Sequence, residues 1–96
     1  MINEETYLKC NYLQGMSDNE CFINFKGSLQ RGNGINGYHI VLKDKVIVKD
    51  KFSGLVSILV ARKDEKTSQI LINGAMDVGA GVYFTVPNEE IVFKEN

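Results

Sequence analysis

Gly54-Leu55-Val56-Ser57-Ile58-Leu59-Val60-Ala61 is the longest apolar run in the chain. Three of its side chains, Val56, Ile58 and Val60, branch at Cβ, which restricts them in a helix and suits them to a pleated strand. The run is short and has polar or charged flanks, which favours a buried strand. A helix with Ser53 as its N-cap is the alternative, although the Glu or Gln of a capping box is missing. Because both faces of such a strand are mainly apolar, the sequence predicts a central strand that is covered on both sides.

The composition is that of an ordinary globular protein. The 96 residues are 44% hydrophobic and 24% charged, with a net charge of −1, and this length predicts a single domain over residues 1–96. The charge balance offers no global field that would attract nucleic acid or an anionic membrane. No apolar run approaches the roughly 20 residues that span a bilayer, and the acidic start of the chain has no apolar signal segment. We therefore expect a soluble cytoplasmic protein.

Besides the central run, seven short segments have strand character and are bounded by turn residues. They are residues 6–13, 21–26, 38–42, 46–48, 69–72, 82–86 and 91–93. Short connections predict two hairpins, one from the first two segments and one in which 38–42 and 46–48 pair across Lys43-Asp44-Lys45. The sequence shows no internal repeat. The predicted fold is all-β, a small and mostly antiparallel barrel or a compact sandwich of about eight short strands.

The chain has two cysteines, which a hairpin turning at Gly15-Met16 would place opposite each other. Cys10 and Cys21 would then be either a redox pair or half of a metal site. The interpretation as two buried thiols is favoured, because free cysteine is among the most buried residue types and a reducing compartment disfavours a disulfide. His39 is the only histidine and has no carboxylate or nucleophile beside it in sequence, so we expect a partly exposed structural residue. We predict no metal site and no cofactor.

Two glycine-rich segments connect the predicted strands. Three glycines within residues 32–37 have G-x-G-x-x-G spacing, but the β-prone residues 38–42 follow them where a dinucleotide-binding motif requires a helix. A binding loop is the better interpretation, because long loops in compact domains often carry function. The second segment, 74–81, combines small residues with Asp77, which suits a turn cap or a contact with a ligand.

The sequence predicts a non-enzymatic protein-binding module, because it lacks converging catalytic groups: adjacent pairs such as Glu89-Glu90 project in different directions. One concrete form is a small bacterial or phage inhibitor or immunity-type protein, and self-association into a homo-oligomer stays open. The partner protein would contact the two glycine-rich loops and exposed tyrosines, since tyrosine often anchors interfaces. The predicted partner-binding residues are Arg31, Asn33, Gly34, Asn36, Tyr38, Asp77 and Tyr83.

Two other classes of function are alternatives. An oligonucleotide-binding barrel would use aromatic and basic side chains on one sheet face, such as Phe22, Asn24 and Lys26, although the net charge of −1 argues against nucleic acid. A small-molecule site would hold a nucleotide or a sugar with backbone amides of the glycine-rich loops.

Overall fold

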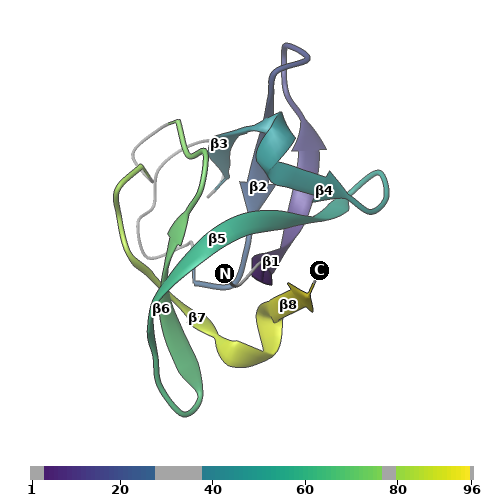
Figure 1. Cartoon of the computed structure of the whole chain (residues 1–96). Helices are drawn as coiled ribbons and strands as arrows, with labels where there is room; N and C mark the ends of the chain where they lie inside the picture. The colour runs from purple at the N-terminus through teal and green to yellow at the C-terminus, as the bar shows by residue number, and fades with distance from the viewer. Residues whose placement is uncertain (1–3, 28–37, 77–79, 96) are drawn as a thin grey trace.

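The computed structural model describes residues 4–27, 38–76 and 80–95. These residues form eight strands and two short 3-10 turns, and no α-helix is found among them (Figure 1). The strands are β1 (Glu4–Gln14), β2 (Glu20–Asn24), β3 (His39–Leu42), β4 (Val46–Val48), β5 (Ser53–Lys63), β6 (Thr67–Ile72), β7 (Phe84–Pro87) and β8 (Ile91–Glu95). The 3-10 turns are η3 (Lys43–Lys45) and η4 (Asn88–Glu90). The predicted all-β, antiparallel fold is confirmed.

All eight strands belong to one antiparallel sheet that curls like half of a barrel. The strand order is β3-β2-β1-β5-β6-β7, with β4 added to β5 and β8 added to β1. The curl brings the segment after β6 to the edge of β3, where Leu42 N donates to Gly74 O at 2.9 Å and Met76 N donates to Ile40 O at 2.8 Å. Val41 and Ala75 also form a bridge there. The backbone groups at this edge of β3 are therefore paired within the chain.

β5 is the central strand that the apolar run predicts. It is 11 residues long and pairs with β1 along one edge and with β4 and then β6 along the other. The helical alternative is wrong, because the pairing of β5 with three strands satisfies backbone groups that a helix would pair internally. A bulge between Val60 and Arg62 bends β5 close to its exposed end.

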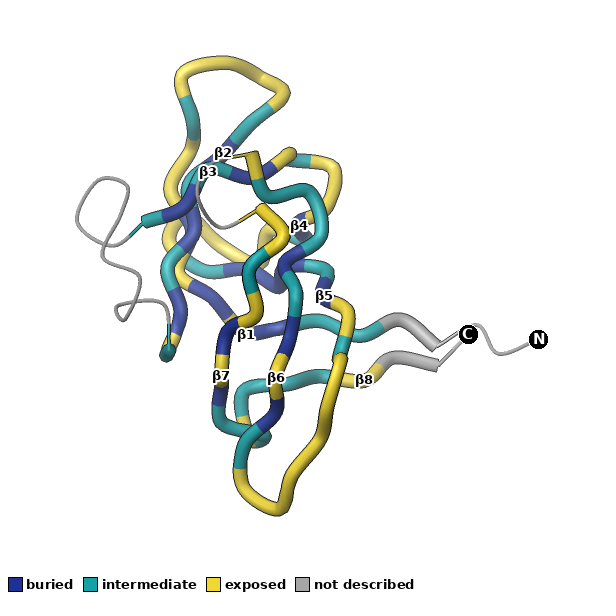
Figure 2. The backbone as a smooth tube through the Cα atoms, turned by 90° about the vertical axis from the view of Figure 1, so that its left-hand side faces the viewer, coloured by how far each residue is buried: buried dark blue, intermediate teal, exposed yellow. Residues whose placement is uncertain are grey.

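The core lies inside the curl, and the exposed residues gather at the hairpin tips (Figure 2). At its centre Leu8 of β1 lies opposite Val56 of β5, and both side chains are fully buried. The other face of β5 is covered only in part. Leu55 is 7% exposed although it is not part of the core cluster, whereas Leu59 on the same face is 56% exposed.

The second predicted hairpin is wrong. β3 pairs with β2, and β4 pairs with β5, so residues 38–42 and 46–48 belong to different parts of the sheet. The reason is η3: Lys43 N donates to Asn19 O at 2.9 Å, and the N–H of Val46 donates to Lys43 O. These bonds turn the chain from one ladder into the next instead of folding it back on itself.

The predicted exposure of His39 is also wrong, because β3 turns its other face inward. His39 is 1% exposed and packs between two aromatic rings, with ring centroids 5.9 Å from Phe25 and 5.3 Å from Phe84. Tyr38 and Ile40, which alternate with it, are half-buried. Strand β7 begins two residues later than the predicted segment 82–86 and includes Pro87.

Truncation at the centre of the β1–β5 pair tests this description of the core. We expect Leu8→Ala to lower the free energy of unfolding by about 2–5 kcal/mol, because it leaves a cavity at a fully buried position. Leu13→Ala is the matched control on the same strand, where the side chain is exposed, and should cost less than about 1 kcal/mol. Urea denaturation followed by circular dichroism measures both changes. Equal losses for the two variants would contradict the assigned core.

Candidate functional site

A groove of about 570 Å³ runs along β5 and is lined from both faces of the strand, by Ser57 and Leu59 on the outer face and by Ile58 and Val60 on the core face. We call it the outer groove. β1 and β5 each contribute both apolar and polar side chains to it. Its apolar side chains are Tyr7 of β1, Ile47 of β4, Ile58, Leu59 and Val60 of β5, and Phe93 of β8. Its polar side chains are Thr6, Asp44, Lys45, Ser57 and Asn73.

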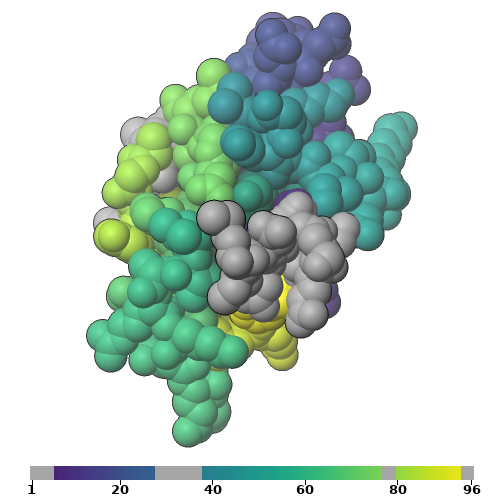
Figure 3. Space-filling view, viewed as in Figure 1, coloured from purple at the N-terminus to yellow at the C-terminus, as the bar shows by residue number. Residues whose placement is uncertain are grey.

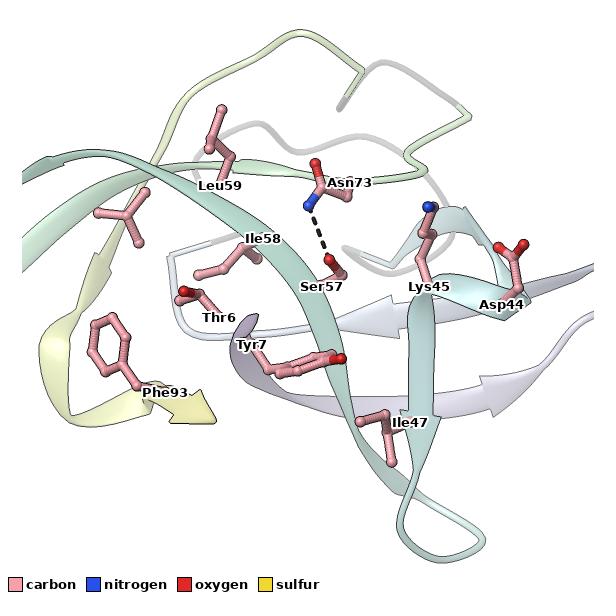
Figure 4. A pocket seen from close by; sticks show the side chains of 11 residues that line it. Thr6, Tyr7, Asp44, Lys45, Ile47, Ser57, Ile58, Leu59, Asn73 and Phe93 are labelled. Carbon is pink, nitrogen blue, oxygen red and sulfur yellow. Dashed lines mark hydrogen bonds between the residues drawn. The ribbon is translucent and has the colours of Figure 1, made fainter. Parts of the chain in front are cut away.

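Strand pairing explains why Tyr7, Ser57 and Leu59 come together, whereas Phe93 lies opposite Thr6 and so reaches the groove from the other face of the sheet. Tyr7 lies opposite Ser57 in the β1–β5 ladder, so the two side chains stand on the same face of the sheet. Leu59 is two residues beyond Ser57 and therefore shares that face. Figure 4 shows Phe93 at one end of the outer groove and Asp44 with Lys45 at the other.

The middle of the outer groove holds a fixed polar pair. Asn73 Nδ2 donates a hydrogen bond to Ser57 Oγ at 2.9 Å (Figure 4), and the backbone N of Asn73 donates to Ser57 O at 3.0 Å. The two bonds hold the Asn73 side chain in one orientation. A bound chain would therefore meet preordered polar groups between an apolar end and a charged end.

Two large apolar side chains of the groove are more than half exposed to solvent. Leu59 is 56% and Phe93 51% exposed, and the Lys63 ammonium lies 5.4 Å from the centre of the Phe93 ring. Figure 3 views the molecule from a side on which β4, the β5–β6 hairpin and β8 all reach the surface. Grouped apolar side chains at a surface are typical of interaction sites, whereas single ones are ordinary.

Most of the predicted binding residues lie outside the described part of the chain. These are Arg31, Asn33, Gly34, Asn36 and Asp77. The two tyrosines are described: Tyr38 is half-buried directly before β3, and Tyr83 is 54% exposed shortly before β7. Neither tyrosine lines the outer groove.

Sequence reasoning missed Ile47, Leu59 and Phe93, because each lies in an apolar run that predicts a strand without showing which of its side chains stay exposed. The signal for Leu59 was present in the alternation along the central strand, which places it on the face of Ser57. No comparable signal exists for Ile47 or Phe93, since their place in the groove depends on which strands pair.

The two cysteines do not face each other as predicted. Cys21 lies opposite Gln14 in the β1–β2 ladder, and Cys10 lies opposite Gly54 in β5. The reason is that the β1–β2 turn is centred farther along the chain than Gly15-Met16. Both thiols are free and buried, which confirms the interpretation as buried side chains.

Burial also controls the acidity of these thiols. It raises the pKa of Cys10 to about 12, with a further rise from the neighbouring Cys21, and it raises the pKa of Cys21 to about 11. Both groups are therefore protonated at neutral pH, and a thiol rather than a thiolate is a poor nucleophile and metal ligand. Among the residues that the structure describes, no three His, Cys, Asp or Glu side chains are placed to hold a metal ion.

Comparison with known proteins gave no match: no family model, no curated protein and no solved structure is significantly similar to this chain. Within the described ranges, no helix is long and apolar enough to cross a membrane.

The thiols give a direct test of these buried positions. We expect iodoacetamide at pH 8 to leave Cys10 and Cys21 unmodified in the folded protein and to modify both in guanidinium chloride, as mass spectrometry would show. Between pH 9 and about 12 the unfolded thiols lose their protons before the folded ones do, so this contribution lowers the free energy of unfolding as pH rises. Rapid modification of either thiol at pH 8 without denaturant would contradict the assignment.

Proposed function

We propose that this protein is a non-enzymatic protein-binding module that binds a segment of its partner in the outer groove. The observation that carries the proposal is that Leu59 and Phe93, both more than half exposed, line the same groove as the fixed Ser57–Asn73 pair. Exposed apolar side chains around oriented polar groups are the usual composition of an interface centre.

The chemistry of the outer groove defines the segment that would fit. Aliphatic or aromatic side chains of the partner would cover Leu59 and Phe93 and remove their apolar surface from water. Backbone or side-chain polar groups of the same segment would meet Asn73, Ser57 and Lys45. A partner bound in this way would be a protein with an exposed apolar residue in a polar surround, and the groove requires no charge of either sign.

The nucleic-acid alternative gains no support from the face that the sequence suggested for it. Lys26 is the basic residue of that face, and its Nζ lies 3.9 Å from Oε2 of Glu90. A neighbouring carboxylate reduces the attraction of an ammonium for phosphate. The glycine-rich loops that would serve a nucleotide or sugar site lie largely outside the described residues, so that alternative stays a prediction from sequence.

Substitution in the outer groove tests the proposed binding surface. We expect Leu59→Asp to lower the affinity for the partner at least tenfold, because it puts a charge where apolar surface would be covered. The measurement is affinity capture from cells of the native host with wild-type, Leu59→Asp and Leu13→Asp baits, followed by quantitative mass spectrometry. Leu13→Asp is the control, since this exposed leucine lies on β1 outside the groove.

The supporting result is a protein captured by the wild type and by Leu13→Asp but not by Leu59→Asp. Circular dichroism must show that all three baits are folded. If no captured protein depends on Leu59, the groove is not the binding surface. Binding of a labelled oligonucleotide that weakens steeply with salt would instead favour the nucleic-acid alternative.

A further inference from the structure

The sheet consists of two halves with the same order of elements. The first half is β1-β2-β3-η3-β4 and the second is β5-β6-β7-η4-β8. Exchanging the halves maps each described ladder onto another: β1–β2 onto β5–β6, β2–β3 onto β6–β7, and β4–β5 onto β8–β1. The β1–β5 ladder maps onto itself. In Figure 1 the two long hairpins accordingly extend toward opposite ends of the molecule.

The match extends to single residue pairs. A shift of 48 residues carries Leu8 onto Val56, and a shift of 45 carries β4 onto β8. These shifts map known pairs onto known pairs: Tyr7–Ser57 onto Leu55–Lys9, Leu8–Ile91 onto Val56–Val46, and, with a shift of 47 for β2, Cys21–Val41 onto Ser68–Val86. The two halves are therefore related by a twofold axis at the Leu8–Val56 pair.

The connections between strands repeat as well. Lys43 N donates to Asn19 O at 2.9 Å in the first half, and Asn88 N donates to Lys66 O at 2.9 Å in the second. These bonds tie each 3-10 turn to the tip of the hairpin in its own half. Each half also has a glycine at the corresponding place after its second strand, and both have positive φ: 101° at Gly27 and 81° at Gly74.

One segment shows the repeat in sequence. Residues 38–48 read YHIVLKDKVIV and residues 83–93 read YFTVPNEEIVF. Identity is low, but buried residues alternate in the same places, because His39 and Val41 correspond to Phe84 and Val86 and all four are buried. The His39 ring also contacts that of Phe84. The prediction that the chain has no internal repeat is therefore wrong, because the repeat is one of pattern and register.

We infer that the described residues within 4–48 and within 53–95 form two copies of one structural unit. We further infer that each unit can pair with the other unit of a second copy of this chain, in place of the one in its own chain. The interface is self-complementary, as in a twofold dimer. The first unit of one molecule can therefore pair with the second unit of another through the same ladders. The result is a closed dimer that contains two complete sheets. In each sheet, one chain contributes the first unit and the other chain contributes the second.

The turn between β4 and β5 decides between the two arrangements. Residues 49–52 fold the chain back, with Lys49 N donating to Ser53 O at 2.9 Å and Phe52 N donating to Asp50 Oδ1 at 2.9 Å. In the exchanged dimer this turn would open, so that β4 and β5 continue as one strand. Each β4 would then pair with β5 of the other molecule.

Shortening this turn tests the inference in the full chain. We expect deletion of residues 49–52 to give a species of twice the variant's own monomer mass, which is four residues below the 10.8 kDa of the full chain, at all concentrations in size-exclusion chromatography with light scattering. The one residue left between Val48 and Gly54 cannot close a hairpin. The β signal in circular dichroism should be unchanged, and the melting temperature should rise with protein concentration. Insertion of Gly-Ser-Gly-Ser after Asp50 is the control and should remain monomeric.

A folded monomer from the deletion variant would overturn the inference. If that variant does not fold, the wild-type chain decides the question. Refolded from denaturant at high protein concentration, it should give a dimer whose fraction grows with concentration, and absence of any dimer would overturn exchange between molecules.

The equivalence of the two units has a separate test. Exchanging the sequences of 38–48 and 83–93 within one chain preserves the composition, and the product should fold with a lowered melting temperature. The control exchanges 38–48 with 82–92, which shifts the register by one residue and turns the buried side chains outward. This control should not fold. Failure of the in-register exchange to fold, or equal stability of the two products, would overturn the equivalence.

Discussion

The structure depends on the antiparallel pairing of β1 with β5 around Leu8 and Val56. Both side chains are fully buried. Every other strand pairs with β1 or β5, or with a strand that does. β2 and β8 add to β1, while β4 and β6 add to β5. Each of the two strands is 11 residues long, which is enough to carry two partners in succession along one edge.

This constraint also produces the outer groove. The face of β5 that points away from the core is covered where β4 lies beside it, at Leu55, and open beyond that point, at Leu59. A short β4 of three residues cannot extend the cover. The twofold relation places a smaller groove of about 190 Å³ on the other half, beside Lys9, Asn11 and Lys26. There the Lys26–Glu90 ion pair stands where the outer groove has Asn73 and Lys45, so the two halves have diverged in the surfaces they present.

Local signals predicted much of the fold. The β-branched central run and the turn residues between short apolar segments correctly indicated an all-β, antiparallel sheet, because alternation and turn chemistry act over a few residues. The errors concern pairing. Residues 38–42 and 46–48 have strand character in sequence, but a 3-10 turn with an anchor at Asn19 separates them. The candidate groove could be predicted only at Leu59 and Tyr7, since Ile47 and Phe93 join it through the β4–β5 and β1–β8 ladders, which no local pattern specifies.

The sequence by itself determined which segments are strands, that the chain is all-β and that its two cysteines are buried thiols. These properties follow from side-chain shape and hydrophobic pattern, which each segment carries alone. Only the tertiary structure decided which strands pair, which face of β3 is buried and where apolar residues stay exposed. It also revealed that two dissimilar sequences form one repeated unit. The central β1–β5 register arises from contacts between residues 42 to 50 positions apart, Asn11–Ser53 to Tyr7–Ser57, and the chain does not encode those contacts in any local pattern.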